Sequence, residues 1–321
     1  MNYEEIKNKF KNELDFVDSL LINNLDSNCE LISDVGKYIT LYSGKKIRPL
    51  ITLLFGKLIN FSQKELFLMS AVVELIHTAT LLHDDVVDNS NKRRSKLSIN
   101  KIWGNKESIL IGDFLYTKSF QMMVAVNNFK ILELMAETTN IMSEGEIKQL
   151  LHRKNYNMTE NDYLNIIISK TAKLFEFSSS IASILCNSND FIFKASRNFG
   201  IFFGIAYQLI DDMLDYTVND DIFGKKTGND ILNGTFTLPL IRLMNTDIKK
   251  KKKIFDLLSS KNFNDYNLIK KIVIESNVLD YTFNLAKNYI TLARKNLNIY
   301  ENTEHKNIAF NILNFIIDRK F

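Results

Sequence analysis

The scarcity of turn-forming residues limits the folds that are open to this chain. Its 321 residues include only 11 glycines and 2 prolines. A β-sandwich, barrel or propeller needs a tight turn about every 8–12 residues, and glycine and proline supply most such turns. Hydrophobic residues make up 45% of the chain and aromatic residues 11%, which excludes a largely disordered protein. The composition therefore predicts a large, mostly helical globular protein.

The charge and the cysteines exclude some functional classes. The formal net charge is +4, from 41 basic and 37 acidic residues, which gives little support for nucleic-acid binding. Cys29 and Cys186 lie far apart and in no metal-ligand spacing, which indicates two free thiols in a reducing compartment. The N-terminus lacks the apolar region of a secretory signal, and no stretch reaches the roughly 18 apolar residues of a membrane span. We therefore expect a soluble, cytoplasmic protein.

Helical periodicity extends over nearly the whole chain, with no repeat or linker, so we expect one domain over residues 1–321. Capping-box spacing marks two helix starts, at Ser62–Glu65 and at Thr159 with Asp162. The run Lys249–Lys253 indicates the solvated start of another helix. The predicted helices cover residues 3–25, 29–42, 49–60, 67–83, 107–127, 130–151, 159–185, 190–216, 236–245, 263–276, 280–299 and 303–319.

Two loops differ from the other short polar connections. In the loop Ser43–Pro49, Gly44 lies at a predicted helix end and Pro49 at the first position of the next helix. The loop Asn219–Gly234 is polar and contains three glycines and several acidic residues. A loop of this length in a helical protein is either a lid or a plain disordered connection.

Two predicted helices end in aspartate clusters of identical spacing. Residues four apart share one face of a helix, so Asp84 and Asp88 point in one direction, as do Asp211 and Asp215. Unpaired carboxylates would repel one another, and a helix C-terminus disfavours negative charge. Oxygen ligands of this kind suit Mg²⁺. One such cluster could be a solvated helix end, but two clusters that each follow an apolar run favour a metal site.

Basic residues suited to binding phosphate lie in the Gly44 loop, at Lys45 and Arg48, and just past the first cluster, at Arg93 and Arg94. The chain contains 33 lysines and only 8 arginines, so each arginine is mildly informative. A guanidinium binds phosphate in a bidentate manner, whereas simple charge balance with the aspartates would need only lysine. His77 lies two helical turns before Asp84 and shares its face, although a single histidine on an apolar helix is usually a core residue.

Together these motifs resemble the trans-prenyltransferases that make polyprenyl diphosphates, and most of all the bacterial octaprenyl diphosphate synthases. The resemblance covers nearly the whole chain in the family's order. Paired aspartate motifs with these flanking residues are highly specific, whereas any one motif alone would be weak. The matching segments are Gly44-Lys45-Lys46-Ile47-Arg48-Pro49, Glu74–Asp88, Arg93-Arg94, Gly112-Asp113-Phe114-Leu115, Glu144-Gly145-Glu146, Lys170-Thr171-Ala172, Gln208 with the second aspartate cluster, and Gly224-Lys225 with Gly228.

The resemblance implies an all-α, single-domain antiparallel helical bundle around a deep central cavity, usually a homodimer, with the two aspartate clusters facing each other. It implies three Mg²⁺ ions, two or more of them bridging the first cluster, held by Asp84, Asp88, Asp211 and Asp215 with Asp212 in support. Lys170 joins these aspartates in the implied catalytic set. The implied allylic diphosphate site consists of Arg93, Lys170, Thr171, Gln208 and Lys225. The implied isopentenyl diphosphate site consists of Lys45, Arg48, His77 and Arg94.

The activity that the resemblance implies is condensation of isopentenyl diphosphate onto an allylic diphosphate, with farnesyl diphosphate as the expected starter. The implied product is octaprenyl diphosphate, a membrane-destined precursor of a quinone side chain such as that of ubiquinone. Short-chain members carry bulky aromatic residues four and five positions before the first cluster, where this chain has the small residues Thr80 and Ala79. The simpler alternative is that both only pack against a neighbouring helix. Ser43 replaces a second glycine and Asn229 an acidic residue that are common in the family.

Three other interpretations of the sequence can be compared with an octaprenyl diphosphate synthase. A synthase of shorter products, from farnesyl to hexaprenyl diphosphate, would carry the same motifs. A non-catalytic subunit of a heteromeric synthase usually lacks one aspartate cluster, and this chain has both. A di-iron helical bundle is suggested by Glu74 and His77, but it requires a second Glu-x-x-His, and no other histidine of the chain follows a glutamate at that spacing.

Overall fold

Four helices with few exposed residues form the centre of the molecule: α4 (Ile47–Leu58), α5 (Lys64–Val87), α10 (Lys173–Leu185) and α11 (Asp190–Thr217). Every residue of α4 except Lys57 is buried, as expected for a helix that is apolar on all sides. Aromatic rings join these helices, with centroids 4.9 Å apart for Phe55 and Phe199 and 5.0 Å apart for Phe175 and Phe203. The core of the bundle therefore lies between α4, α5, α10 and α11.

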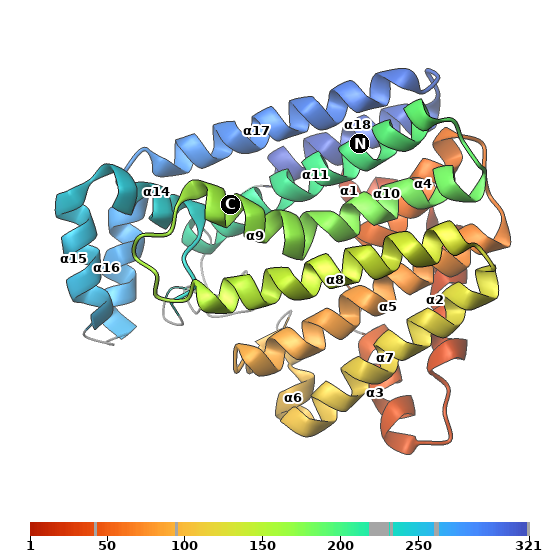
Figure 1. The fold of residues 1–321 in the computed structure, drawn as a ribbon, viewed down its shortest axis with the longest axis horizontal. Coiled ribbons are helices and arrows are strands. Elements are labelled where there is room, and N and C mark those ends of the chain that lie inside the picture. The colour runs from red at the N-terminus through yellow and green to blue at the C-terminus, as the bar shows by residue number, and fades with distance from the viewer. Residues whose placement is uncertain (42–43, 94–95, 218–230, 232–233, 260–262, 320–321) are drawn as a thin grey trace.

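The computed structural model describes residues 1–41, 44–93, 96–217, 231, 234–259 and 263–319, and within these ranges the other helices surround the four central ones (Figure 1). Short connections, such as residues 127–128 between α7 and α8, make consecutive helices antiparallel. The predicted all-α, single-domain bundle is thus confirmed. The surrounding elements are α1 (Tyr3–Lys9), α2 (Lys11–Leu25), α3 (Glu30–Leu41), β1 (Lys92–Arg93), β2 (Lys96–Leu97), α6 (Ile99–Ile102), α7 (Asn105–Val126), α8 (Phe129–Leu151), α9 (Glu160–Ile167), η1 (Ile168–Ala172), α14 (Leu238–Thr246), α15 (Ile248–Ser259), α16 (Phe263–Ile274), α17 (Val278–Asn296), η2 (Leu297–Ile299) and α18 (Glu304–Ile317).

Some predicted helix starts are confirmed and others are wrong. Thr159 and Asp162 form the predicted capping box, and the Lys249–Lys253 run lies at the start of α15. The capping box predicted at Ser62 is wrong, because Gln63 precedes α5 without a side-chain cap. The helix predicted from Pro49 begins at Ile47 instead. Proline is tolerated there because the first helical turn has no intrahelical acceptors for its N–H groups.

Other differences concern a break within one predicted helix and the segments that connect the helices. The helix predicted over residues 3–25 is broken at Phe10, which ends α1 and precedes α2 while its ring is buried near His305. The antiparallel hairpin of β1 and β2, in which Lys92 faces Leu97, and the short helix α6 were not predicted. Residues 218–230 and 232–233 of the loop Asn219–Gly234, including Lys225 and Asn229, lie outside the described residues, as do Ser43 and Arg94.

The helix predicted over residues 159–185 contains a π-helical turn, η1, between α9 and α10. Glycine at position 145 of α8 permits a close approach to this turn. A Cβ at Gly145 would lie 2.7 Å from the Ser169 Cβ and 3.1 Å from the backbone nitrogen of Lys170. Since neither distance leaves room for a side chain, Gly145 allows α8 and η1 to lie against each other.

Two helices, α5 and α7, are long and apolar enough to cross a membrane by length and composition alone. The prediction that no stretch reaches that length was therefore too strict. In α5, 61% of the most apolar window is buried inside the protein, which is typical of a core helix. In α7 the buried share is only 33%, and several of its apolar side chains are exposed.

Candidate active site

A cavity of about 1110 Å³ lies where the C-terminal ends of α5, α8, α11 and α18 meet the start of α4 and the turn η1. Asp215 and Ala79 are not part of its wall, and Ala79 is fully buried. Both aspartate clusters nevertheless contribute to this one cavity. The predicted site residues in its wall are Lys45, Arg48, His77, Thr80, Asp84, Asp88, Arg93, Lys170, Thr171, Gln208, Asp211 and Asp212.

Asp84, the first carboxylate of the first cluster, lies beside a lysine from η1. The Nζ of Lys170 is 3.4 Å from Asp84 Oδ2, and it donates hydrogen bonds to Glu146 Oε2 at 2.7 Å and to Gln149 Oε1 at 2.9 Å. Both Glu146 and Gln149 belong to α8, which approaches η1 because of Gly145. Lys170 is therefore held over the first cluster by three side chains.

Burial and charge have opposite effects on the ionisation of Lys170. Burial disfavours its charged form, but the carboxylates of Asp84 and Glu146 outweigh this effect and raise the pKa of Lys170. Burial, together with the neighbouring Asp84 carboxylate, raises the pKa of Glu146 to about 7, although Lys170 partly offsets the shift. Lys170 is thus a permanently charged group in a cavity that is rich in carboxylates.

Asp88, the last carboxylate of the first cluster, forms an ion pair with Arg153. Arg153 follows His152, the residue that ends α8, and its amide donates to the Leu150 carbonyl at 3.2 Å. The C-terminal ends of α5 and α8 are therefore joined at the cavity by a carboxylate and a guanidinium.

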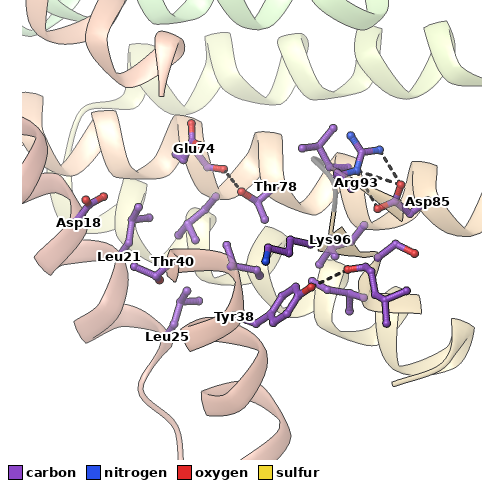
Figure 2. Close-up of a pocket in the computed structure, with 17 residues that line it drawn as sticks. Asp18, Leu21, Leu25, Tyr38, Thr40, Glu74, Thr78, Asp85, Arg93 and Lys96 are labelled. Carbon is purple, nitrogen blue, oxygen red and sulfur yellow. Dashed lines mark hydrogen bonds and ion pairs between the residues drawn. The ribbon is translucent and has the colours of Figure 1, made fainter. Parts of the chain in front are cut away.

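Asp85 points away from this cavity and is almost fully buried. Arg93 of β1 donates hydrogen bonds to the Asp85 carboxylate (Figure 2). Its Nε lies 3.0 Å from Oδ1 and 2.9 Å from Oδ2, and its Nη2 lies 2.8 Å from Oδ1. A second cavity of about 90 Å³ lies on this side of α5, against α2 and α3, and Arg93 and Glu74 line both cavities. The Asp85 carboxylate thus fixes Arg93 between them.

The second cluster is fixed by a chain of hydrogen bonds. Thr171 Oγ1 donates to Gln208 Oε1 at 2.9 Å, and Gln208 Nε2 donates to Asp212 Oδ1 at 2.7 Å. Asp212 also accepts the hydroxyl of Tyr163 at 2.5 Å. Burial and the adjacent Asp212 carboxylate hold the pKa of Tyr163 well above its usual value, so this phenol remains a donor. Asp215 is half-buried, and its backbone carbonyl accepts the Tyr266 hydroxyl at 3.3 Å.

Asp211 meets a cation from the C-terminal end of the chain. Arg319 Nη1 lies 3.1 Å from Asp211 Oδ1, and Nη2 donates to the Tyr207 hydroxyl at 3.1 Å. Burial opposes the charged form of Arg319, but Tyr207 and Asp211 outweigh this effect and raise its pKa. All three side chains line the cavity.

Lys45, Arg48 and His77 form a second group of basic residues in the cavity wall. The Arg48 guanidinium lies 4.3 Å from the centroid of the Phe175 ring, and the Lys45 ammonium lies 5.1 Å from that of Phe315. Such stacking on aromatic rings is typical of cations that are held in place for a ligand. Besides Arg319 at the second cluster, the wall therefore carries basic residues in two places, one at the first aspartate cluster and one at the start of α4.

The donor set suits Mg²⁺ bound together with a phosphate ligand. Within the described residues, no group of three or more His, Cys, Asp or Glu side chains forms a ready cage for a metal. Mg²⁺ is usually held by one or two carboxylates, while water and phosphate oxygens complete its octahedral shell. Asp84, Asp88 and Asp211, which line the same cavity, provide carboxylates of this kind.

Several residues in or beside the cavity were missed by the analysis of the sequence. Two of them, Arg153 and Arg319, could have been found from the rarity of arginine in a lysine-rich chain. The others carry no sequence signal of that strength. The missed residues are Gln149, Arg153, Tyr163, Tyr207 and Arg319, whereas Glu146 belongs to one of the matching segments but was given no role.

Comparisons with known proteins agree with this geometry. The polyprenyl synthetase family model matches residues 29–275. Octaprenyl diphosphate synthase of Haemophilus influenzae is 34% identical over 100% of this chain and 98% of its own, and that of Escherichia coli is 40% identical over 76% of each. The crystal structure of a Caulobacter crescentus polyprenyl synthase complexed with calcium and isoprenyl diphosphate has a TM-score of 0.94 and 30% identity, covering 99% of this chain and 98% of that one. Sequence and fold thus point to the same group of proteins.

Proposed function

The chain belongs to the polyprenyl synthetase family and is a prenyl diphosphate synthase, and from that premise we propose that it elongates farnesyl diphosphate to octaprenyl diphosphate in a Mg²⁺-dependent reaction. The observation that carries the proposal is the convergence of both aspartate clusters and two groups of basic residues on one cavity. Two diphosphate substrates require two cationic sites, and a metal-bound leaving group requires carboxylates beside one of them.

The proposed reaction breaks the C–O bond between the allylic carbon and its diphosphate. The isopentenyl double bond then attacks the allylic cation, a C–C bond forms, and loss of a proton gives a product longer by one isoprene unit. Bound Mg²⁺ would stabilise the charge that develops on the departing pyrophosphate. Lys170 would share that task through its permanent charge, while Thr171 and Gln208 would orient the second cluster. No protein nucleophile is needed.

The apolar part of the cavity would protect the cation from water. Its wall includes Leu81 on α5, Ile167 on α9, Leu174 on α10 and Leu214 on α11, which lie among the polar residues of the two clusters. We propose that the prenyl chain grows along this surface and past Thr80. Release of so apolar a product is consistent with use in a membrane, as in a quinone side chain, by an enzyme that itself works in the cytoplasm.

The decisive experiment is incubation of purified protein with Mg²⁺, farnesyl diphosphate and labelled isopentenyl diphosphate, with product length read by chromatography. We expect octaprenyl diphosphate as the main product. Products no longer than geranylgeranyl diphosphate would replace this proposal with a short-chain synthase. Failure of the protein to form any product alone, but not with a partner chain, would identify a subunit of a heteromeric synthase.

Substitution Arg48→Lys tests the assignment of the isopentenyl diphosphate site. Arg48 is buried and stacked on Phe175, so lysine keeps the charge but loses both the planar stacking and the bidentate fork. We expect KM for isopentenyl diphosphate to rise about tenfold, with KM for the allylic substrate changed about twofold or less. Equal rises in both constants, or none, would contradict the assignment.

We also propose that two copies of the chain associate through α7 and α8. Large apolar side chains are exposed along both helices, and a soluble surface rarely carries so many together. A homodimer that buries them is expected to dissociate when lysines replace Leu110 and Leu151, as measured by sedimentation velocity. Ile248→Lys on α15, where the replaced side chain is equally exposed, serves as the control. The exposed apolar residues are Ile109, Leu110, Val124, Phe129, Ile147, Leu150 and Leu151.

A further inference from the structure

Arg153 occupies a position that none of the sequence motifs includes. It follows the C-terminus of α8, and its guanidinium pairs with Asp88 through Nη2. The Arg153 side chain is only 23% exposed, and its Nε is buried without a hydrogen-bond partner. An unsatisfied buried donor costs free energy, so an acceptor for the Arg153 Nε would stabilise the protein.

An ion pair that only joined the ends of α5 and α8 would not require arginine. The chain places lysine at 33 of its 41 basic positions, and lysine can also form an ion pair with a carboxylate. Arginine adds a planar fork of five N–H donors that matches the oxygens of a phosphate. The choice of arginine beside Asp88 is therefore better explained by an acceptor with several oxygens than by charge balance.

A metal at Asp88 would compete with Arg153 for the negative charge of this carboxylate, whose Oδ1 is paired with Arg153 Nη2. The outer carboxylates of the clusters that line the cavity are each paired with a cation. These pairs are Asp84 with Lys170, Asp88 with Arg153, and Asp211 with Arg319. A metal that neutralises Asp88 weakens this ion pair, and the largely buried Arg153 cation then favours a new anionic partner.

We propose that Arg153 is an additional diphosphate-binding residue of the allylic site, which exchanges the Asp88 carboxylate for a diphosphate oxygen when the metal and the diphosphate bind together. This inference rests on the proposed function, because the ligand is the metal-bound diphosphate of the allylic substrate. Arg153 thereby opposes binding of the metal alone and favours binding of the metal with diphosphate.

The exchange predicts opposite changes in two affinities of the Arg153→Gln variant. Mn²⁺ prefers the same oxygen ligands as Mg²⁺. Its unbound concentration, and so its affinity for the protein, can be measured by electron paramagnetic resonance in the absence and presence of inorganic pyrophosphate. Without pyrophosphate, we expect the variant to bind Mn²⁺ about threefold or more tightly, because Asp88 no longer has a competing cation. With pyrophosphate, we expect the complex to bind about tenfold more weakly, because a charge-assisted fork is lost.

Other roles of Arg153 would give other results. A residue that only compensates Asp88 would, when removed, tighten both affinities, and a structural tie would weaken both or neither and lower the melting temperature. Either result would overturn the inference. Arg197→Gln is the matched control, because Arg197 is also partly exposed and paired with a carboxylate, Glu176, which retains Lys173. Neither affinity should change in that variant.

Arg153→Lys keeps the inference testable if Arg153→Gln does not fold. Lysine retains the charge beside Asp88, so binding of Mn²⁺ alone should match wild type, while binding with pyrophosphate should weaken about threefold or more. Unchanged binding with pyrophosphate would contradict the exchange. If wild-type protein itself does not bind Mn²⁺ with pyrophosphate, the proposed function fails together with the inference. If wild-type protein binds both but the variants do not show the predicted changes in affinity, only the inference fails and the proposed function stands.

Discussion

Replacement of Asp84 or Asp211 by alanine is expected to lower kcat about a thousandfold or more while the helical fold remains intact. Each change removes a carboxylate expected to hold Mg²⁺ against the departing pyrophosphate. Neither change leaves a cation isolated, because Lys170 retains Glu146 and Gln149, and Arg319 retains the Tyr207 hydroxyl. Turnover of labelled isopentenyl diphosphate measures the loss, and circular dichroism with a thermal melt measures the fold.

Removal of the metal should reproduce the effect of these substitutions. EDTA is expected to abolish turnover in the wild-type protein, and added Mg²⁺ should restore it. Asp113→Ala is a suitable control, because Asp113 is an exposed carboxylate of α7 that lies beside His83 and outside the cavity wall. Its activity should remain near that of wild type. Full turnover in EDTA would exclude the proposed metal-dependent mechanism.

Replacement of Thr80 by phenylalanine is expected to shorten the main product from octaprenyl to geranylgeranyl length. Thr80 lies in the cavity wall four residues before Asp84, about 6 Å along the helix axis beneath the proposed diphosphate site. An aromatic ring there would occupy the path of the growing chain. Chromatography of the product gives its length, and the rate of the first condensation should be largely retained.

The Ala79→Tyr variant tests whether Ala79, like Thr80, borders the path of the growing chain. Ala79 is fully buried and outside the cavity wall, so a tyrosine ring must displace packed neighbours and should cost about 1–3 kcal/mol of stability. If the ring enters the chain path, the product shortens as with Thr80→Phe. Unchanged product length in a folded, active Ala79→Tyr enzyme would mean that Ala79 only packs the core. An unchanged length in both variants would contradict the proposed tunnel.

The helices and the two aspartate clusters could be predicted from the sequence because their signals are local. Helical periodicity identifies helices one at a time, and the aspartate clusters each lie within a single turn and a half. The exceptions depend on distant residues. The break at Phe10 accompanies burial of its ring near His305, which no local pattern reports.

The missing parts of the site depend on tertiary contacts in the same way. Arg319 meets Asp211 across 108 residues, and Arg153 meets Asp88 across 65. Tyr163 reaches Asp212 across 49 residues, and its neighbours in the chain give no hint of that partner. Asp215, which was expected beside these residues, is not among those that line the cavity.

The π-helical turn η1 has a consequence for insertions and deletions. A π-turn is equivalent to one extra residue within an α-helix, and one residue corresponds to a rotation of about 100°. The turn therefore sets the rotational phase of α10, whose residues Leu174 to Ile184 are buried, relative to α9. Deletion of one residue from Ile168–Ala172 would restore a regular helix and rotate either Lys170 away from Asp84 or α10 away from its core contacts. The one extra residue of η1 therefore allows Lys170 to reach Asp84 while α10 keeps its contacts in the core.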